Sequence, residues 1–492
     1  MDRRPRFRIV GLGYLAQTPA LGGSLDGDLG VCLGTQSFDG FRVGAMARLV
    51  HSHLQWRNPL ALVASLAKSF QKPLLFMTKQ LFPILLLSVL IDFSSAVSAE
   101  TKTPWLDKEH VEKRMDGLTE VSGKGPSQWR IIWTKDPATS ATVSWTTASK
   151  GKKHHVSYQM HVPGKDAKTQ SVVVESHRDG PYSGAEGEHF HHVRLTGLKP
   201  STTYRFVITS DGQSSPSMHF TTAPSDDREF HLLFGGDSRS GHFARAQVNL
   251  LMAALAEEDK DLIAFAHGGD YIGSGKSWSQ WSRWLSQHEL TVTATGKALP
   301  IIPTRGNHDG GPLYDEIFDS PGSSGKNYFS TKLSPQVALV TLNSEISAGG
   351  SQQAWLGKTL QSLRPEVRWL LAEYHRPAWP AVKKPGAAKK FWVPLFEQFN
   401  VDLVVESDGH VIKRTVPIRN EKQDPTGVVY VGEGGLGVSQ RRPDRNRWFL
   451  KAPGMAGAGH HVMRVSFGKK ELDYEAILLD RKVADRTQLS PR

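Results

Sequence analysis

Short apolar runs separated by turn residues occupy the stretch from residue 128 to residue 224. The runs are rich in Val, Ile, Thr and aromatic residues, as in ATVSWTT at 141–147. Turn signals such as Asp211-Gly212 separate them. Because such runs recur at short spacing without a helical stretch, residues 127–224 are predicted to form a small all-β sandwich.

After residue 228 the pattern changes to buried strands that alternate with amphipathic helices. REFHLLFGG at 228–236 has the continuous apolar character of a buried strand, and AQVNLLMAALAEED at 246–259 has apolar residues at helical spacing. This alternation continues through the rest of the chain and predicts an α/β domain over 228–480. The fold class expected is therefore an all-β sandwich followed by an α/β domain, with ligands gathered at the carboxyl ends of the strands.

The segment before the sandwich has a different character. Residues 77–99 contain a lysine, an apolar run and small residues that end at Ala99, which is the architecture of a signal peptide. The apolar run is too short to span a membrane comfortably, so no span is expected in the mature chain. We interpret residues 1–76 as a non-native or disordered extension upstream of a start at Met77, and residues 100–126 as a linker. The alternative is a genuine extension followed by a signal anchor. Either way the mature protein is expected to be secreted or periplasmic.

Composition and charge narrow the function classes. The chain has 492 residues and a net charge of +12, which suits an anionic substrate but does not imply nucleic acid. Its single cysteine, Cys32, excludes a disulfide scaffold and a cysteine-ligated metal site. Any metal must therefore be bound by His, Asp, Glu, Asn, Tyr or backbone oxygen.

Five polar clusters carry the candidate chemistry, and each follows or ends an apolar run that is predicted to be a strand. A single Gly-Asp pair is more often a turn than a ligand, but GNHD after a buried strand places an amide beside an imidazole. The clusters are Asp237 in GGDSRSG, Asp270 in HGGDYIG, Asn307-His308-Asp309 in RGNHDGG, His375 in EYHRP, and Asp408 with His410 in ESDGHVIKR.

In this order the clusters resemble those of the calcineurin-like metallophosphoesterases, in particular the purple-acid-phosphatase-like branch. That branch carries a sandwich domain before its catalytic domain, and LTGLKPSTTYRFVI resembles the corner of a fibronectin type III domain. The resemblance implies an α/β/β/α catalytic domain that binds two metal ions. It implies that Asp237 binds the first metal, that Asp270 bridges both, and that Asn307 and His375 bind the second.

The same resemblance implies roles for the residues that follow Asn307. His308 would act beside the leaving group as an acid or electrostatic stabiliser, and Asp309 would orient His308. A pair of metal ions can form the nucleophile, neutralise the phosphoryl oxygens and stabilise the leaving oxygen.

Three positions depart from the family pattern. At the last motif, alignment on Lys413-Arg414 places Asp408 where a second-metal imidazole is expected and keeps His410 at the first metal. The other registration would pair His410 with Ile412 and lose a ligand. Arg239 stands where the superfamily often has a histidine ligand, and Gly273 stands where the purple enzymes have a tyrosine.

These departures favour hard ions such as Mn²⁺, Mg²⁺ or iron over zinc, in one or two sites. Arg239 could replace part of the charge of the first metal and hold phosphate through its planar fork.

The expected function is an exported metallophosphoesterase that hydrolyses small phosphate monoesters, as an acid phosphatase does, by in-line attack of a metal-bound hydroxide. The alternatives are a phosphodiesterase or nucleotidase of the same fold, and a degenerate, non-catalytic module that binds phosphate or sugar.

Overall fold

The computed structural model describes residues 103–161, 171–320 and 326–492. The extension expected at 1–76 and the signal peptide expected at 77–99 lie outside the described residues. Within the described ranges, no helix is both long and apolar enough to cross a membrane.

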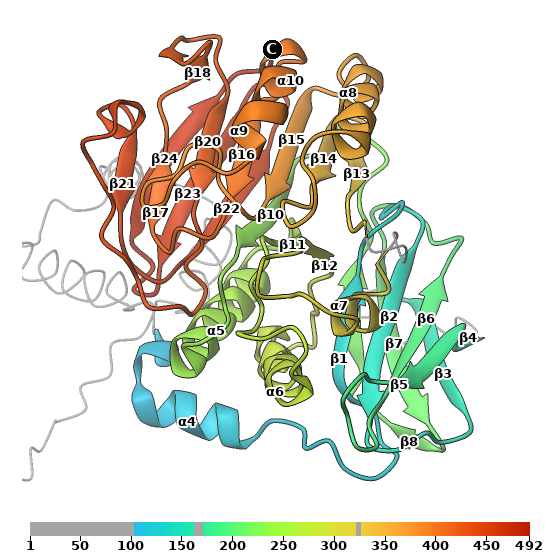
Figure 1. Ribbon diagram of the computed structural model, residues 1–492. Helices are drawn as coiled ribbons and strands as arrows, with labels where there is room; N and C mark the ends of the chain where they lie inside the picture. The colour runs from blue at the N-terminus through green and yellow to red at the C-terminus, as the bar shows by residue number, and fades with distance from the viewer. Residues whose placement is uncertain (1–102, 162–170, 321–325) are drawn as a thin grey trace, which may run out of the picture. The chain divides into compact units, whose positions relative to one another are not determined.

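A ten-stranded sheet runs through the whole described region (Figure 1). Strands β10, β11 and β12 are parallel at its centre, and β1 pairs in parallel with β12 through Ile132 and Ile301. The first sheet of the expected sandwich therefore continues into the α/β region. In spatial order its strands are β24 (Val483–Leu489), β23 (Leu472–Leu478), β22 (His461–Phe467), β10 (Phe230–Gly235), β11 (Leu262–His267), β12 (Ile301–Pro303), β1 (Ser127–Ile132), β2 (Ala141–Thr147), β6 (His189–Leu195) and β5 (Arg178–Pro181).

A seven-stranded sheet forms the second layer of the α/β region. Its strands β14, β15, β16 and β20 are mutually parallel, and the other three pair antiparallel. In spatial order they are β13 (Phe329–Ser334), β14 (Val337–Thr341), β15 (Trp369–Tyr374), β16 (Leu403–Glu406), β20 (Val429–Gly432), β17 (Ile412–Arg414) and β21 (Met455–Gly457).

The sandwich is completed by a smaller sheet that faces the β1, β2 and β6 strands. In it Tyr204 accepts a hydrogen bond from the backbone N–H of Lys199 at 2.8 Å, which fixes the preceding turn. Its strands are β3 (His154–Met160), β4 (Val172–Glu175), β7 (Thr203–Ser210), β8 (Gln213–Ser214) and β9 (Met218–Thr221), and a separate pair is β18 (Ile418–Arg419) with β19 (Lys422–Gln423).

The ten-stranded and seven-stranded sheets pack face to face, and helices cover their outer faces. Alternate residues of β10 show this division, because Leu232 joins the core between the sheets while Leu233 joins the core under the helices. The first sheet is covered by α5 (His242–Glu258), α4 (Lys108–Asp116) and η1 (Pro104–Leu106). The second is covered by α8 (Ser351–Leu363), α9 (Ala388–Phe391), α10 (Val393–Gln398) and η3 (Trp448–Leu450). The predicted β-sandwich followed by an α/β/β/α domain is confirmed.

A further group of helices packs beside β1 and β12. The tryptophans Trp278, Trp281 and Trp284 are buried there and form a core with residues of the same group. These helices are α6 (Trp278–His288), η2 (Glu289–Thr291) and α7 (Leu313–Phe318).

The segment expected to be a linker contains helix α4. Asp107 caps this helix by accepting a hydrogen bond from the N–H of His110 at 3.2 Å. Just before it, Trp105 is buried and donates through Nε1 to the carbonyl of Leu479 at 2.6 Å. The segment is thus docked on the α/β region by one aromatic anchor, which its polar composition had hidden.

Candidate metal centre

The five polar clusters meet where the carboxyl ends of the ten-stranded and seven-stranded sheets face each other. Asp237, Asp270 and the 307–309 segment follow β10, β11 and β12 of the first sheet. His375 follows β15, and the 408–410 segment follows β16 of the second sheet. Parallel strands bring these ends to one edge, which is why residues far apart in sequence become neighbours.

Four of these side chains form a compact, buried cluster. Ligand atoms of Asp237, Asp270, His375 and Asp408 all lie within 4.8 Å of one another. The Nε2 atom of His375 lies 3.3 Å from Asp270 Oδ1 and 3.6 Å from Asp408 Oδ1. On the other side, His410 Nε2 lies 3.2 Å from Asp237 Oδ1. The cluster could hold a metal ion.

The unsatisfied polar atoms of the cluster fit this interpretation. Buried polar atoms are almost always hydrogen-bonded, so an exception calls for a missing partner. Four such exceptions meet here, and they are Asp237 Oδ1, Asn307 Oδ1, His375 Nε2 and His410 Nε2. His375 has its other ring nitrogen, Nδ1, on the carbonyl of Gly268 at 2.8 Å, which orients Nε2 towards the cluster. The atoms left free are carboxylate or amide oxygens and imidazole nitrogens, as a metal ion requires.

The backbone at these positions is held in an uncommon conformation. Asp237, Asp270, Asp408 and His410 all have positive φ, between 57° and 69°. Non-glycine residues seldom adopt the left-handed region, and such strain concentrates at functional sites. The Asp237 carboxylate has room because residue 434 is a glycine. A Cβ on Gly434 would lie 1.9 Å from Asp237 Oδ2.

Asp309 has a different position from the one expected. Its buried carboxylate does not contact the His308 ring; it accepts backbone N–H groups from Asp270 at 2.8 Å, Tyr271 at 3.0 Å and Gly306 at 2.8 Å. The expectation that Asp309 orients the His308 side chain is therefore wrong. Asp309 instead ties the segment that carries Asp270 to the segment that carries Asn307.

His308 lies at the open side of the cluster and is held by other groups. Its backbone N–H donates to Asp270 Oδ1 at 2.9 Å, and its Nδ1 donates to the carbonyl of Gly273 at 2.7 Å. These contacts leave Nε2 facing Asp270 Oδ2 at 3.9 Å, with one third of the side chain exposed. When both of its ring nitrogens are protonated, His308 can therefore present the Nε2 proton to a group that approaches from solvent.

Comparison with known proteins agrees with this arrangement. The family model for the purple acid phosphatase N-terminal domain matches residues 126–222, and the model for calcineurin-like phosphoesterases matches residues 204–412. Residues 126–412 therefore match these two domain models in the order in which purple acid phosphatases carry them.

Individual relatives of this family are distant in sequence. An uncharacterized protein of Mycobacterium tuberculosis is 24% identical over 63% of this chain and 63% of its own length. Purple acid phosphatase 15 of Arabidopsis thaliana is 25% identical over 50% of this chain and 53% of its own. The chain thus spans less than two thirds of these two relatives. The solved structure of purple acid phosphatase PPD1 from yellow lupin aligns with a TM-score of 0.62 at 17% identity, over 75% of this chain and 74% of the lupin chain, which shows the shared fold.

Two cations stand at the positions where this chain departs from the purple acid phosphatase pattern. Arg239 donates through Nε to Asp270 Oδ2 at 3.3 Å, and one fifth of its side chain is exposed. Lys383 pairs with Asp408 Oδ1 through its ammonium group. The sequence alone does not mark Lys383 as a site residue, because the surrounding lysine-rich stretch is typical of a solvated loop. The one sequence feature that could have indicated a role for Lys383 is its position eight residues after His375.

The third departure from the family pattern is Gly273, which stands where the purple enzymes have a tyrosine, and the nearby Tyr271 does not replace that tyrosine. Tyr271 is fully buried and its ring stacks on His267 at 3.8 Å between centroids, with its hydroxyl donating to the His267 carbonyl at 3.3 Å. Its phenol therefore packs beside the strand and does not replace the family's tyrosine ligand.

The clustered charges also shift the pKa of His375. Burial by itself lowers this pKa, but the carboxylates of Asp270, Asp408 and Asp237 outweigh burial and raise it well above its usual range. Without a metal the histidine therefore holds a proton among the carboxylates.

A buried ionic group supports the segment that carries Asp408 and His410. The ammonium of Lys413 pairs with Glu406, lies 2.9 Å from Glu433 Oε1 and donates to the Trp379 carbonyl at 2.9 Å. All three charged side chains are fully buried. Because Glu406 and Lys413 flank residues 407–412, this group fixes both ends of the metal-binding turn.

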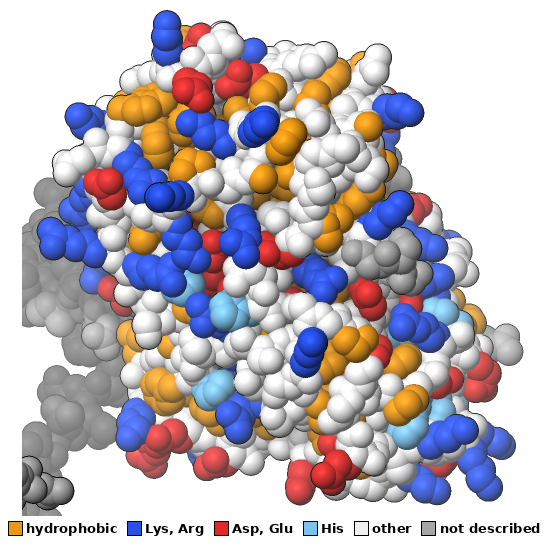
Figure 2. Space-filling model, viewed as in Figure 1, with side chains coloured by type: hydrophobic (Ala, Val, Ile, Leu, Met, Phe, Trp, Pro, Cys, Tyr) orange, Lys and Arg blue, Asp and Glu red, His pale blue; other side chains and the backbone are white. Residues whose placement is uncertain are grey.

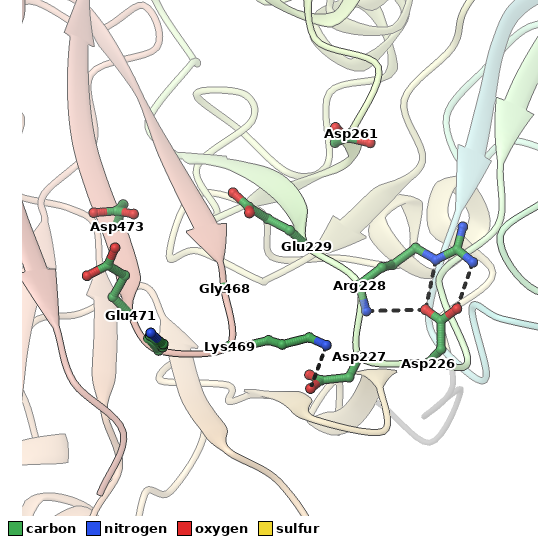
Figure 3. Close-up of a pocket in the computed structure, with 10 residues that line it drawn as sticks. Asp226, Asp227, Arg228, Glu229, Asp261, Gly468, Lys469, Glu471 and Asp473 are labelled. Carbon is green, nitrogen blue, oxygen red and sulfur yellow. Dashed lines mark hydrogen bonds and ion pairs between the residues drawn. The ribbon is translucent and has the colours of Figure 1, made fainter.

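A cavity of about 850 Å³ lies at the opposite, amino-terminal end of β10 and β11. Two ion pairs join charged residues of its lining, Arg228 with Asp226 and Lys469 with Asp227 (Figure 3). Asp261 and Glu229 precede the same two strands whose other ends carry the cluster. This cavity is separate from the metal centre.

Proposed function

We propose that this chain is an exported, metal-dependent phosphoesterase that hydrolyses small phosphate monoesters, as an acid phosphatase does. The observation that carries the proposal is the set of four unsatisfied ligand atoms at the ends of β10, β12, β15 and β16. Four such atoms at the ends of neighbouring strands favour a bound cation. The match to the calcineurin-like phosphoesterase model supports the same reaction class.

The residues divide into two candidate ligand sets that share Asp270. Asn307, His375 and Asp408 would complete one set, and Asp237 with His410 would complete the other. Metal ions bound here generate a nucleophile at neutral pH and neutralise charge on a phosphoryl group.

The remaining side chains act on the substrate. Arg239 is placed to donate to phosphoryl oxygens, because its guanidinium lies over Asp270 and stays partly exposed. His308 is placed to protonate the leaving oxygen through Nε2, since Nδ1 is fixed by the Gly273 carbonyl. Loss of the His308 side chain removes this proton without disturbing the backbone N–H on which Asp270 depends.

The test is the activity of the purified protein on aryl phosphates with added Mn²⁺, compared with His308→Ala. We expect His308→Ala to lower turnover by roughly 10²–10⁴-fold on phenyl phosphate. The loss should be smaller on 4-nitrophenyl phosphate, whose better leaving group depends less on protonation. His110→Ala, on helix α4, is the matched control. Equal losses on the two esters would contradict the general-acid role of His308.

The same assay separates the alternative functions. A phosphodiesterase or nucleotidase of this fold would prefer bis(4-nitrophenyl) phosphate or a nucleotide to the monoester. A protein that hydrolyses none of these with Mn²⁺, and shows no difference on adding a chelator, would be a non-catalytic binding module.

A further inference from the structure

A second cavity, of about 720 Å³, lies beside the metal centre and is lined by an arginine-rich loop. The loop spans residues 440–446 between β20 and η3, and it contributes Arg441, Arg442 and Arg445 to the lining. Figure 2 shows Lys and Arg side chains gathered on one face around a small area of acidic and histidine side chains.

Hydrogen bonds join this loop directly to the metal-binding turn. The backbone N–H of Arg441 donates to the carbonyl of His410 at 3.0 Å. The guanidinium of Arg441 donates to the carbonyl of Asp408 at 3.3 Å. Arg441, which lines the cavity, is therefore hydrogen-bonded to the backbone of the metal-binding turn.

The same loop is fixed to the segment that carries Lys383. Arg447, just after the cavity, donates to the carbonyls of Val382 and Lys383, each at 2.9 Å. The N–H of Asp444 donates to the carbonyl of Ala381 at 2.8 Å. The arginines are therefore presented on a loop with an ordered backbone, which lowers the entropy cost of binding a ligand.

The charges in the cavity are not balanced within the protein. Asp444, the acidic residue of the loop, faces Arg447 at 3.4 Å. Arg442 and Arg445 are exposed, and no ion pair joins either to an acidic residue among the described parts of the chain. A guanidinium presents a planar fork that matches phosphate, sulfate or carboxylate oxygens.

We propose that this cavity binds a second anionic group of the substrate, so that the enzyme prefers phosphate esters that carry another phosphate, sulfate or carboxylate. The inference rests on the proposed phosphoesterase function and specifies its substrate class. The scissile phosphate lies at the metal centre, and the second anion lies against Arg442 and Arg445.

The test compares glucose 1-phosphate with glucose 1,6-bisphosphate in the Mn²⁺-supplemented enzyme and in the double variant Arg442→Gln/Arg445→Gln. The wild-type enzyme should have the higher kcat/KM on the bisphosphate. In the variant the ratio of the two kcat/KM values should fall about fivefold, mainly through KM, as expected for two solvent-exposed charge pairs. About 0.5 M NaCl should reduce the wild-type preference, because salt screens exposed charges.

A matched variant, Lys135→Gln/Lys150→Gln, removes two exposed positive charges from the sandwich and should leave the ratio as in the wild type. A ratio equal in the wild type and the arginine variant would overturn the inference while leaving the phosphoesterase function intact. An equal fall in the lysine variant would also overturn it, since it would assign the preference to net charge. Failure to hydrolyse either ester, or aryl phosphates, would instead refute the proposed function.

Discussion

Replacement of Lys413 by methionine tests how the metal-binding turn is held in place. Lys413 uses all three of its ammonium hydrogens, on Glu406, Glu433 and the Trp379 carbonyl, and none of the charged groups reaches solvent. Glu406 also accepts from the Tyr374 hydroxyl and the Ala378 N–H, each at 2.6 Å. Methionine fills a similar volume, so the main change is the loss of the positive charge.

The expected cost is large because two carboxylates lose their only buried counter-ion. Breaking a buried ionic group by removing one partner typically costs about 3–5 kcal/mol. The free energy of unfolding of Lys413→Met should therefore fall by about 3–5 kcal/mol at pH 8. Burial raises the pKa of Glu433 to about 7, even though Lys413 opposes this rise. Without the lysine, the pKa of Glu433 should rise further in the folded state.

The pH dependence provides the sharper test. A carboxyl whose folded pKa is raised stabilises the fold while protonated, and this stability is lost as pH rises through the folded pKa. The deficit of Lys413→Met should therefore shrink between pH 8 and pH 5. Urea denaturation followed by tryptophan fluorescence at both pH values measures the deficit.

Two further variants complete the design. Adding Glu433→Gln to Lys413→Met should recover part of the stability, since it removes one of the stranded charges. Lys470→Met, at an exposed position, controls for the loss of a lysine. A deficit below about 1 kcal/mol, the range of an exposed ion pair, or one that does not change with pH, would refute the role given to this buried group.

Three other predictions concern pH and metal. Burial raises the pKa of Glu289 to about 7, so the wild-type fold loses stability as pH rises from about 4.5 to 7. The variant Glu289→Gln keeps an acceptor for the Gln128 N–H, and it should raise the Tm at pH 8 but hardly at pH 5. An equal change in Tm at both pH values would contradict this prediction. Mn²⁺ should bind more tightly as pH rises and its binding should release a proton, because His375 must lose the proton that Asp270 and the neighbouring carboxylates stabilise on it. Calorimetry in buffers of different ionisation enthalpy measures the number of protons released. Binding without proton release would contradict this prediction. Metal analysis should find one ion retained per chain after desalting, and two retained ions would contradict weaker binding beside Asp237 and His410.

The parts that the sequence could predict were those with a local signal. The candidate ligands follow runs of apolar residues, most of which end in glycine or a turn residue, as the run before Asp270 does in FAHGGD. In a parallel sheet such run ends must meet, so their convergence needed no long-range information. The same reasoning gave the layered α/β/β/α domain after a β-sandwich.

The parts that it missed depend on contacts between distant segments. Nothing in the sequence of β1 predicts that it pairs with β12, so the continuous ten-stranded sheet could not be foreseen. Asp309 follows His308 directly, which favoured a role in orienting it, but its carboxylate turns to three backbone N–H groups. Lys383 lies in a lysine-rich loop, and the composition of that loop does not show which lysine contacts the Asp408 carboxylate.

The charges around the candidate metal centre argue for one strongly held ion. Counted as ionised, Asp237, Asp270 and Asp408 carry three negative charges, and Arg239 and Lys383 oppose two of them at direct contact. These five side chains therefore have a net charge of −1. One bound divalent ion would bring the net charge to +1, and a second would bring it to +3. Asp270, Asn307, His375 and Asp408 offer four side chains to one ion, whereas the other set relies on Asp237, His410 and the shared Asp270. Arg239 pairs with the shared Asp270 and Lys383 pairs with Asp408, so fixed cations face both sets, and the sets differ in the number of side chains that they offer. We therefore infer that the ion beside Asp237 and His410 is the weaker one, and that Arg239 supplies part of its charge to the phosphoryl group.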